Sequence, residues 1–155
     1  MVSGNARNPQ ERRRFMNESL VAEREISRGT PEISAMTRRI LIVDDEALIR
    51  WSVAESLEDA GFVTSEAGTA AEALTQLDRD GGFAVVLLDL RLPDSSDLGL
   101  LRRVRQLAPE SRVILMTAHG SPELLAEARQ LGAVNTLNKP FDMARVVGLV
   151  REAAA

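Results

Sequence analysis

A repeated change between two kinds of hydrophobic segment, from residue 39 onward, is the feature that most constrains how this chain folds. Short, continuous apolar runs, which are typical of strands buried on both faces, alternate with amphipathic segments of helical spacing. The predicted strands cover residues 40–43, 62–67, 83–88, 113–116 and 134–138. Those at 40–43, 83–88 and 113–116 are continuous apolar runs, whereas 62–67 is rich in β-forming residues and 134–138 is a short strand. The amphipathic segments cover residues 47–60, 69–78, 98–107, 121–131 and 142–150. This order predicts an α/β fold in which helices cover both faces of a doubly wound, five-stranded parallel sheet.

Residues that commonly begin helices stand at the borders of these segments. Thr69 and Glu72 form a capping box at the start of the second amphipathic segment. Ser121 precedes Pro122, which suits the first position of a helix, and Asp142 precedes the last segment. These signals support the predicted alternation of strands and helices.

The composition excludes several classes of function. The chain has 155 residues, a length that suits a single domain, with no Cys and one His. Disulfides, thiol nucleophiles and most zinc sites are therefore excluded. The net charge of -4 argues against a general nucleic-acid-binding surface. No apolar run approaches the ~20 residues of a membrane helix, and the start lacks the apolar core of a signal peptide, so we expect a cytoplasmic protein with no nucleic-acid or membrane partner.

Residues 1–35 differ from the remainder because they are polar and offer few large apolar side chains. We expect a disordered tail there and one folded domain over residues 36–155. Met36 stands just before the first apolar run, so an upstream start codon assigned in error is the alternative explanation of these residues.

Polar residues stand at the ends of four of the predicted strands. They are Asp44, Asp45 and Glu46 at the end of the first strand, Asp89 at the third, Thr117 at the fourth and Lys139 at the fifth. Because the carboxyl ends of parallel strands meet at one edge of a sheet, we expect these side chains in one crevice. Any one of them alone is more simply a turn or capping residue, but their occurrence at four strand ends favours a site.

Electrostatics indicates what this crevice would bind. Two like charges about 4 Å apart repel by about 4 kcal/mol at an effective dielectric of about 20, and Lys139, the only lysine in the chain, neutralises one carboxylate at most. An all-oxygen site of this kind suits Mg²⁺. Magnesium beside a carboxylate, a hydroxyl and an ammonium group indicates phosphoryl transfer, with Asp89 as the nucleophile. Thr117 and Lys139 would then hold the phosphoryl oxygens.

Four sequence motifs together resemble the receiver domain of two-component response regulators. They are VDDE at residues 43–46, LLDLRLP at 87–93, MTA at 116–118 and NKPFD at 138–142. The resemblance covers residues 37–154 and implies a flavodoxin-like sheet with the strand order 2-1-3-4-5. It also implies that Asp89 takes a phosphoryl group from a sensor histidine kinase or a phosphotransfer protein, with a small phosphodonor as the alternative source.

The resemblance further implies roles for individual residues. The implied ligands of Mg²⁺ are Asp45, Asp89 and the backbone carbonyl of Arg91, with Asp44 acting mainly through water. Thr117 and Lys139 would sense the phosphoryl group, and the Lys139–Pro140 peptide bond would be cis, an isomer found in about 5–6% of X–Pro bonds.

Several positions bear on how such a switch would work. Thr136 occupies a place where the family usually has an aromatic residue, so we expect a different signal readout. Asp97 stands where many relatives have glycine, which predicts another backbone path after Asp89. Arg91 and His119 occupy positions that modulate phosphorylation and dephosphorylation rates in the family. A general-base or phosphohistidine role for His119 is the less favoured alternative.

We therefore expect a stand-alone phosphorylation switch rather than an enzyme, with slow self-dephosphorylation only. The chain ends within a few residues of Val150, so output would pass through another protein at a surface of about residues 121–154. Apolar residues there, which either contact that partner or pack in the core, are Leu124, Leu125, Ala128 and Val146. One alternative is a phosphohydrolase of the haloacid dehalogenase kind, for which Arg91 stands where a second aspartate is needed. The other is a phosphorylation-independent scaffold.

Overall fold

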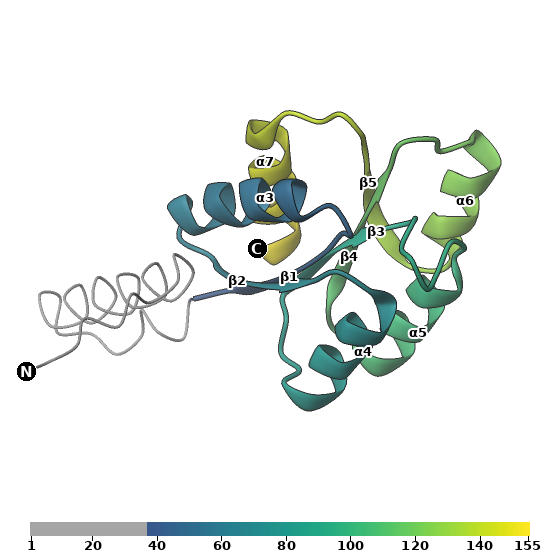
Figure 1. Cartoon of the computed structure of the whole chain (residues 1–155), viewed down its shortest axis with the longest axis horizontal. Helices are drawn as coiled ribbons and strands as arrows, with labels where there is room; N and C mark the ends of the chain where they lie inside the picture. Colours follow the sequence, from purple (N-terminus) through teal and green to yellow (C-terminus); the bar gives the residue numbers. More distant parts are fainter. Residues whose placement is uncertain (1–36) are drawn as a thin grey trace, which may run out of the picture. The chain divides into compact units, whose positions relative to one another are not determined.

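The computed structural model describes residues 37–155, which form a parallel sheet with helices on both faces (Figure 1). The strands are β1 (Arg39–Val43), β2 (Val63–Ala67), β3 (Val85–Asp89), β4 (Arg112–Thr117) and β5 (Ala133–Asn138). The helices in this part of the chain are α3 (Ala47–Asp59), α4 (Ala70–Arg79), α5 (Gly99–Leu107), α6 (Pro122–Gln130) and α7 (Met143–Ala154). The strands pair in the order β2-β1-β3-β4-β5, so the predicted fold class and strand order are confirmed. The predictions about residues 1–35 and Met36 lie outside the described residues.

The register of the parallel strands brings their carboxyl ends together. Val43, the last residue of β1, pairs with Leu88 of β3. Asp89, which ends β3, pairs in turn with β4. Thr117, which ends β4, pairs with Asn138 at the end of β5. The residues that follow these positions therefore share one edge of the sheet.

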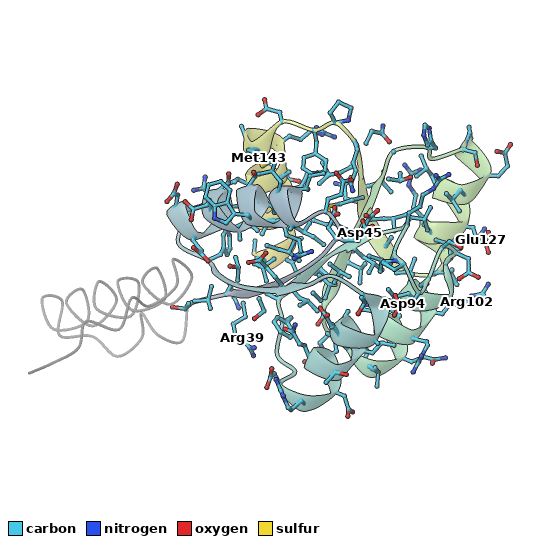
Figure 2. The ribbon with its side chains drawn as sticks, in the orientation of Figure 1. Arg39, Asp45, Asp94, Arg102, Glu127 and Met143 are labelled. Atoms are coloured by element: carbon cyan, nitrogen blue, oxygen red, sulfur yellow. The ribbon has the colours of Figure 1, made fainter. Side chains whose placement is uncertain are left out.

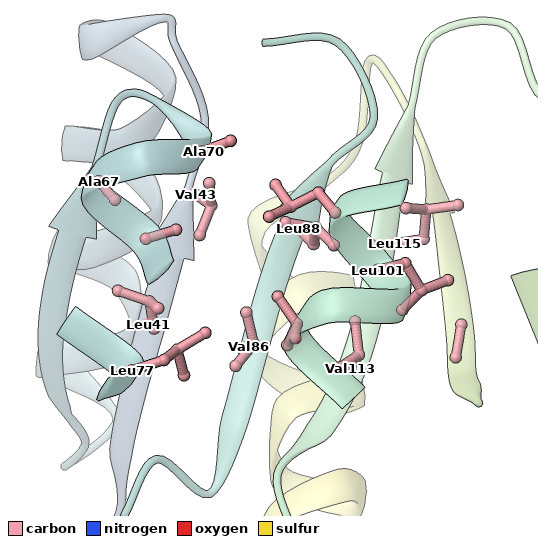
Figure 3. Packing of buried hydrophobic residues seen from close by; sticks show 14 of the residues in the cluster. Leu41, Val43, Ala67, Ala70, Leu77, Val86, Leu88, Leu101, Val113 and Leu115 are labelled. Carbon is pink, nitrogen blue, oxygen red and sulfur yellow. The ribbon is translucent and has the colours of Figure 1, made fainter. Parts of the chain in front are cut away.

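Alternate strand residues face opposite sides of the sheet and belong to two hydrophobic clusters. On one side, Leu41 and Val86 belong to a cluster with residues of α4 and α5, such as Leu101 (Figure 3). On the other side, Ile42 belongs to a cluster with residues of α3 and α7, such as Leu57. Both faces of the sheet are covered, which explains why the central strands β1, β3 and β4 contain continuous apolar runs.

Side-chain caps begin three of the helices where the sequence predicts them. The Thr69 hydroxyl oxygen accepts a hydrogen bond from the Glu72 N–H at 3.1 Å at the start of α4. The Ser121 hydroxyl caps α6, and the Asp142 carboxylate caps α7. Helix α7 continues to Ala154, beyond its predicted end at residue 150, because its last turn packs against the core.

The structure decides the role of the apolar residues in the expected partner surface. Ala128 and Val146 are fully buried, so the partner-contact alternative is wrong for them and they are core residues. Leu124 is half-buried and packs against the core, and Leu125 is half-buried as well. Of these four residues, Leu124 and Leu125 alone expose part of their surface to a partner.

The helices of the described residues are short, and some are linked at the surface. The longest of them, α3, has 13 residues. The ion pair between Arg102 of α5 and Glu127 of α6 links these two helices at the surface, with 3.5 Å between Nη2 and Oε1 (Figure 2).

No helix among residues 37–155 has the length and apolar character needed to cross a membrane.

Candidate functional site

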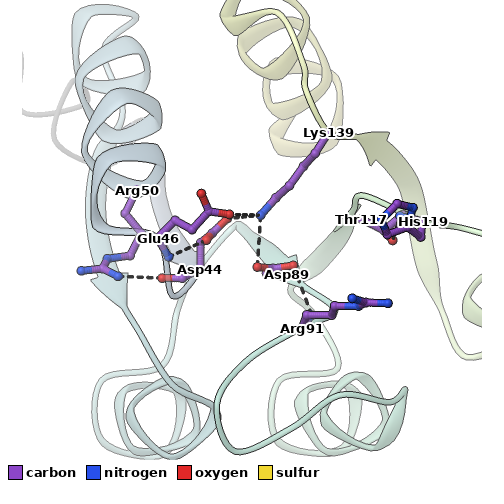
Figure 4. Close-up of polar contacts among 8 residues, drawn as sticks. All are labelled: Asp44, Glu46, Arg50, Asp89, Arg91, Thr117, His119 and Lys139. Carbon is purple, nitrogen blue, oxygen red and sulfur yellow. Dashed lines mark hydrogen bonds and ion pairs between the residues drawn. The ribbon is translucent and has the colours of Figure 1, made fainter.

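Lys139 joins the ends of two strands at the carboxyl edge of the sheet. Its Nζ lies 2.7 Å from Asp44 Oδ2 and 3.1 Å from Asp89 Oδ2 (Figure 4). The Lys139 backbone N–H donates to the Thr117 carbonyl at 2.9 Å, so hydrogen bonding between β5 and β4 continues up to this residue. The Lys139–Pro140 peptide bond is cis. The sequence places Asp44, Asp89 and Lys139 at three strand ends. In the structure the Lys139 ammonium group contacts both carboxylates.

Asp44 is fully buried, and each of its oxygens accepts a hydrogen bond. Oδ2 accepts from Lys139 Nζ, and Oδ1 accepts from the Glu46 backbone N–H at 2.8 Å. The backbone carbonyl accepts from Arg50 Nη1 at 2.7 Å. A buried charge is costly unless it is paired and hydrogen-bonded, and Asp44 meets both conditions.

Asp89 ends β3 with 6% of its surface exposed. Its Oδ1 accepts the Arg91 backbone N–H at 3.2 Å, while Oδ2 contacts Lys139. Burial, followed by the charge of Asp44, raises the pKa of the Asp89 carboxyl group. The Arg91 N–H and the Lys139 ammonium group oppose this rise in pKa. Because both oxygens have donors, the carboxylate is held in one orientation.

The Lys139 side chain is 12% exposed, and burial alone would lower the pKa of its ammonium group. Hydrogen bonds to Asp44 and Asp89, together with attraction to their charges, outweigh burial and raise this pKa above its usual value. Lys139 is therefore positively charged at neutral pH and offsets part of the repulsion between the two carboxylates.

Asp44, Asp45 and Glu46 gather carboxylate oxygens at the end of β1. One oxygen from each residue lies within 4.8 Å of the others, and the side chains of Asp45 and Glu46 are exposed. Glu46 Oε1 is also 3.7 Å from Lys139 Nζ. Hard oxygen donors of this kind are the ligands that Mg²⁺ prefers. This set of oxygen donors therefore fits a magnesium ion. Lys139 contacts two residues of the set, Asp44 and Glu46, and it also contacts Asp89.

Thr117 ends β4, and its carbonyl accepts the Lys139 backbone N–H. It is 3% exposed, and its hydroxyl oxygen accepts the His119 backbone N–H at 3.2 Å. The side chains of Arg91 and His119 are exposed. Thr136 is half-buried and pairs with Leu115, two residues before the last pair of β4 and β5, so it lies below the edge of the sheet.

Most of the described residues match one family model, that of the response regulator receiver domain, over residues 40–151. This span includes Asp44, Asp89, Thr117 and Lys139. The chain belongs to the response regulator receiver domain family. The identification made from the four sequence motifs is therefore confirmed.

Two curated relatives of this receiver domain differ in how much of their length it covers. Sporulation initiation phosphotransferase F of Bacillus subtilis (strain 168) is 32% identical over 117 residues, which are 76% of this chain and 94% of the relative. The DNA-binding transcriptional regulator NtrC of Escherichia coli (strain K12) is 37% identical over 114 residues, which are 74% of this chain and 24% of the relative. The chain thus spans about a quarter of the length of NtrC.

Solved structures show the same fold. The response regulator receiver domain protein (CheY-like) from Methanospirillum hungatei JF-1 has a TM-score of 0.72 and 30% sequence identity, and the match covers 76% of this chain and 94% of that chain. The likeness agrees with the observed strand order. The receiver domain is accordingly a phosphoacceptor module of two-component phosphorelay signalling.

Glu46, which the sequence places in the crevice together with Asp44 and Asp45, shares the oxygen cluster with them. One residue that contacts the site of the receiver domain is not predicted from the sequence. Arg50 donates to the Asp44 carbonyl from α3. An arginine near the start of an amphipathic helix is usually a solvent-exposed residue, so the sequence carries no specific signal for Arg50.

Proposed function

We propose that this receiver domain is a stand-alone phosphorylation switch in which Asp89 is the phosphoacceptor. A sensor histidine kinase or a phosphotransfer protein supplies the phosphoryl group, and another protein responds to the result. The contact of Lys139 with the buried carboxylates of Asp44 and Asp89 carries this proposal. An ammonium group in that position can form a charge-assisted hydrogen bond with a phosphoryl oxygen added to Asp89.

The placement of the Asp89 carboxylate suits it to nucleophilic attack. One carboxylate oxygen attacks the phosphorus atom of a phosphohistidine, and the P–O bond forms as the P–N bond breaks. The departing imidazole nitrogen takes up a proton from solvent, and Asp89 becomes an acyl phosphate. The Arg91 N–H and Lys139 favour the ionised carboxylate that this step requires.

The acidic residues at the strand ends support a role for magnesium. The residues that would hold it are Asp45, Asp89, the backbone carbonyl of Arg91 and, mainly through water, Asp44. Bound Mg²⁺ would supply positive charge to the acidic cluster and to the phosphoryl oxygens. The exposed carboxylates of Asp45 and Glu46, which lie beside buried Asp44, support this assignment.

Thr117 and Lys139 would sense the phosphoryl group. The Thr117 hydroxyl oxygen accepts a hydrogen bond from His119 and so retains its own hydrogen for donation to a phosphoryl oxygen. The exposed side chains of Arg91 and His119 would tune the rates of phosphorylation and dephosphorylation. Thr136 stands in place of an aromatic residue and would therefore change how a partner protein recognises the phosphorylated state.

The output surface in this proposal comprises residues 121–154. Leu124 and Leu125 remain its candidate apolar contacts because they are half-buried, whereas Ala128 and Val146 belong to the core. The 94% coverage of sporulation initiation phosphotransferase F supports a receiver that acts without a second domain. NtrC, by contrast, extends well beyond the region that matches.

The side chain two residues after Asp89 favours a switch over a phosphohydrolase. An aspartate-nucleophile hydrolase of the haloacid dehalogenase kind needs a second carboxylate at that position, and the exposed Arg91 stands there instead. We propose that the chain loses its phosphoryl group slowly and does not turn over phosphomonoesters. The contact of Lys139 with Asp89 argues against a scaffold that is independent of phosphorylation.

Replacement of Asp89 tests the proposed function. Incubation with Mg²⁺ and either a phosphorylated sensor kinase or an acyl phosphate should add one phosphoryl group to the wild type and none to D89N, as measured by intact-protein mass spectrometry. Asp78→Asn, at an exposed position of α4, is the matched control and should be labelled like the wild type. Lys139→Ala should fold but be impaired in phosphorylation or in its response. Equal labelling of D89N and the wild type would refute the assignment.

A further inference from the structure

Arg50 contacts Asp44 on the side opposite to Lys139 (Figure 4). Its Nη1 donates to the Asp44 backbone carbonyl at 2.7 Å, whereas Lys139 binds the carboxylate of the same residue. The Arg50 side chain is 21% exposed and belongs to α3. The contact therefore connects α3 directly to the end of β1.

The neighbouring strand β2 holds the Arg50 guanidinium group in place. Glu66 Oε1 of β2 lies 3.4 Å from Arg50 Nε, so the two charges balance each other. Gly68 follows β2, and a Cβ at this position would lie 3.2 Å from Arg50 Nη1. The glycine therefore leaves the space that the guanidinium group occupies.

The geometry of this arrangement depends on arginine rather than on positive charge alone. The guanidinium group is a planar fork with donors in fixed directions. Here Nη1 donates to the carbonyl of Asp44, directly after β1, while the buried Nε makes no hydrogen bond but lies 3.4 Å from the Glu66 carboxylate of β2. A lysine ammonium group would keep the charge but would not span the Asp44 carbonyl and the Glu66 carboxylate in the same way.

We propose that Arg50 is a positioning residue for the magnesium-dependent phosphorylation of Asp89. It fixes the Asp44 carbonyl and hence the turn that presents the exposed carboxylates of Asp45 and Glu46. This inference rests on the proposed function and adds a residue that would touch neither the metal ion nor the phosphoryl group.

The charge of Arg50 and its positioning role predict opposite changes in magnesium affinity. A cation near the acidic cluster repels Mg²⁺, so removal of that charge alone would tighten binding. Loss of the fixed turn would weaken binding, and removal of groups that orient metal ligands typically costs about 10–100-fold in affinity or activity. The direction of the change therefore separates the two roles.

Three variants, titrated with magnesium chloride in a calorimeter, test the positioning role. R50M keeps the apolar stem and removes both the charge and the donors, and it should bind Mg²⁺ about tenfold or more weakly. R50K keeps one donor that can reach the Asp44 carbonyl, and this donor should recover part of the loss even though the retained charge repels Mg²⁺. G68A changes no charge, and the φ of Gly68 is not positive, so an alanine causes no backbone strain there. Its Cβ displaces the guanidinium group by a few tenths of an ångström, so G68A should weaken binding less than R50M does.

Two further variants control for indirect effects. R50M/G68A should bind Mg²⁺ as R50M does, because an alanine at position 68 then has no guanidinium group to displace. Arg79→Met removes one arginine from an exposed position of α4, where Nε lies 3.6 Å from Asp80 Oδ1, and it should bind Mg²⁺ like the wild type. Urea unfolding of each variant measures any change in stability separately from the change in affinity.

Weaker magnesium binding by folded R50M, with partial recovery in R50K, supports the inference. Unchanged or tighter binding by folded R50M overturns it and leaves the proposed function intact, since the wild type would still bind Mg²⁺ and be labelled at Asp89. If R50M does not fold, the R50K and G68A titrations decide instead. Weaker Mg²⁺ binding than in the wild type then supports the inference, and unchanged or tighter binding overturns it. A wild type that neither binds Mg²⁺ nor becomes labelled overturns the proposed function and this inference together.

Discussion

At the scale of single residues, Asp94 links the loop after Asp89 to the start of α4. Its two carboxylate oxygens accept the backbone N–H groups of Ala70 and Ala71 at 2.8 and 3.0 Å. These hydrogen bonds, that from Ala70 first, lower the pKa of the Asp94 carboxyl group below its usual value of 3.8. A pKa that is lower in the folded than in the unfolded state means that ionised Asp94 stabilises the fold.

The stabilisation by Asp94 should depend on pH. It is fully present well above pH 3.8, where the carboxyl group is ionised in both states, and it is lost as the pH falls through the lower pKa of the folded state. The difference in unfolding free energy between the wild type and D94N should therefore shrink as the pH is lowered from neutral through this range. Urea unfolding measures it, with the exposed D78N as control. A difference that stays constant on acidification would contradict this role.

Residues of the site differ in how far the sequence predicts their position. Asp44, Asp89 and Lys139 stand at the ends of predicted strands. Parallel pairing brings such positions to one edge, so the contact between these residues is predictable. Arg50 and Asp94 are not predictable in this way. Each binds backbone groups of another segment, and the distance to those groups depends on how the elements pack rather than on any local pattern.

At the scale of elements, two glycines near the carboxyl end of the chain have opposite effects on their helices. Gly132, after α6, has a φ of +106°, and a Cβ there would lie 2.7 Å from Arg105 Nε. Gly148 lies inside α7, where nothing is within 4 Å of an added Cβ. The first position requires glycine, whereas the second incurs the entropic cost of glycine in a helix without any gain in packing.

Alanine substitution should separate these two glycines. G132A should lower the unfolding free energy by about 1–2 kcal/mol because of the left-handed backbone. G148A should raise it by about 0.5–1 kcal/mol. Urea unfolding of the two variants measures both changes, and changes of the same sign would contradict the assignment.

The boundaries of elements are less predictable than their order. Phe83 is buried and is the first residue of the third predicted strand, but β3 begins only at Val85. The Phe83 ring lies against Arg39, with 4.4 Å between the guanidinium carbon and the ring centroid, and its carbonyl accepts the Ser111 hydroxyl at 2.7 Å. Residue 83 is therefore apolar because it belongs to the core, and apolar character alone does not mark the start of a strand.

At the scale of the whole described molecule, the strands contribute to both hydrophobic clusters at once. Leu57 of α3 lies on one side of the sheet and Leu101 of α5 on the other. Because alternate residues of the same strands contact both sides, loss of either cluster exposes the sheet that supports the other. The two faces should therefore unfold together.

Substitutions on the two faces test this cooperativity. L57A and L101A should each lower the unfolding free energy by about 2–5 kcal/mol, and their effects should add within about 0.5 kcal/mol. Each variant should unfold in a single transition when circular dichroism and fluorescence are compared. Leu48→Ala, at a position of α3 that is 74% exposed, is the control and should change stability by less than about 0.5 kcal/mol. Separate transitions for the two faces would contradict a shared core.

The single lysine of the chain makes its side-chain amino group a selective target for chemical modification. The structure places its amino group between Asp44 and Asp89, and apart from the α-amino group the sequence contains no other amine. An acylating reagent that modifies amines can therefore mark one internal position only. The rate at which that mark appears reports whether Lys139 is bound to its two carboxylates, so the receiver domain carries a chemical probe of its own site.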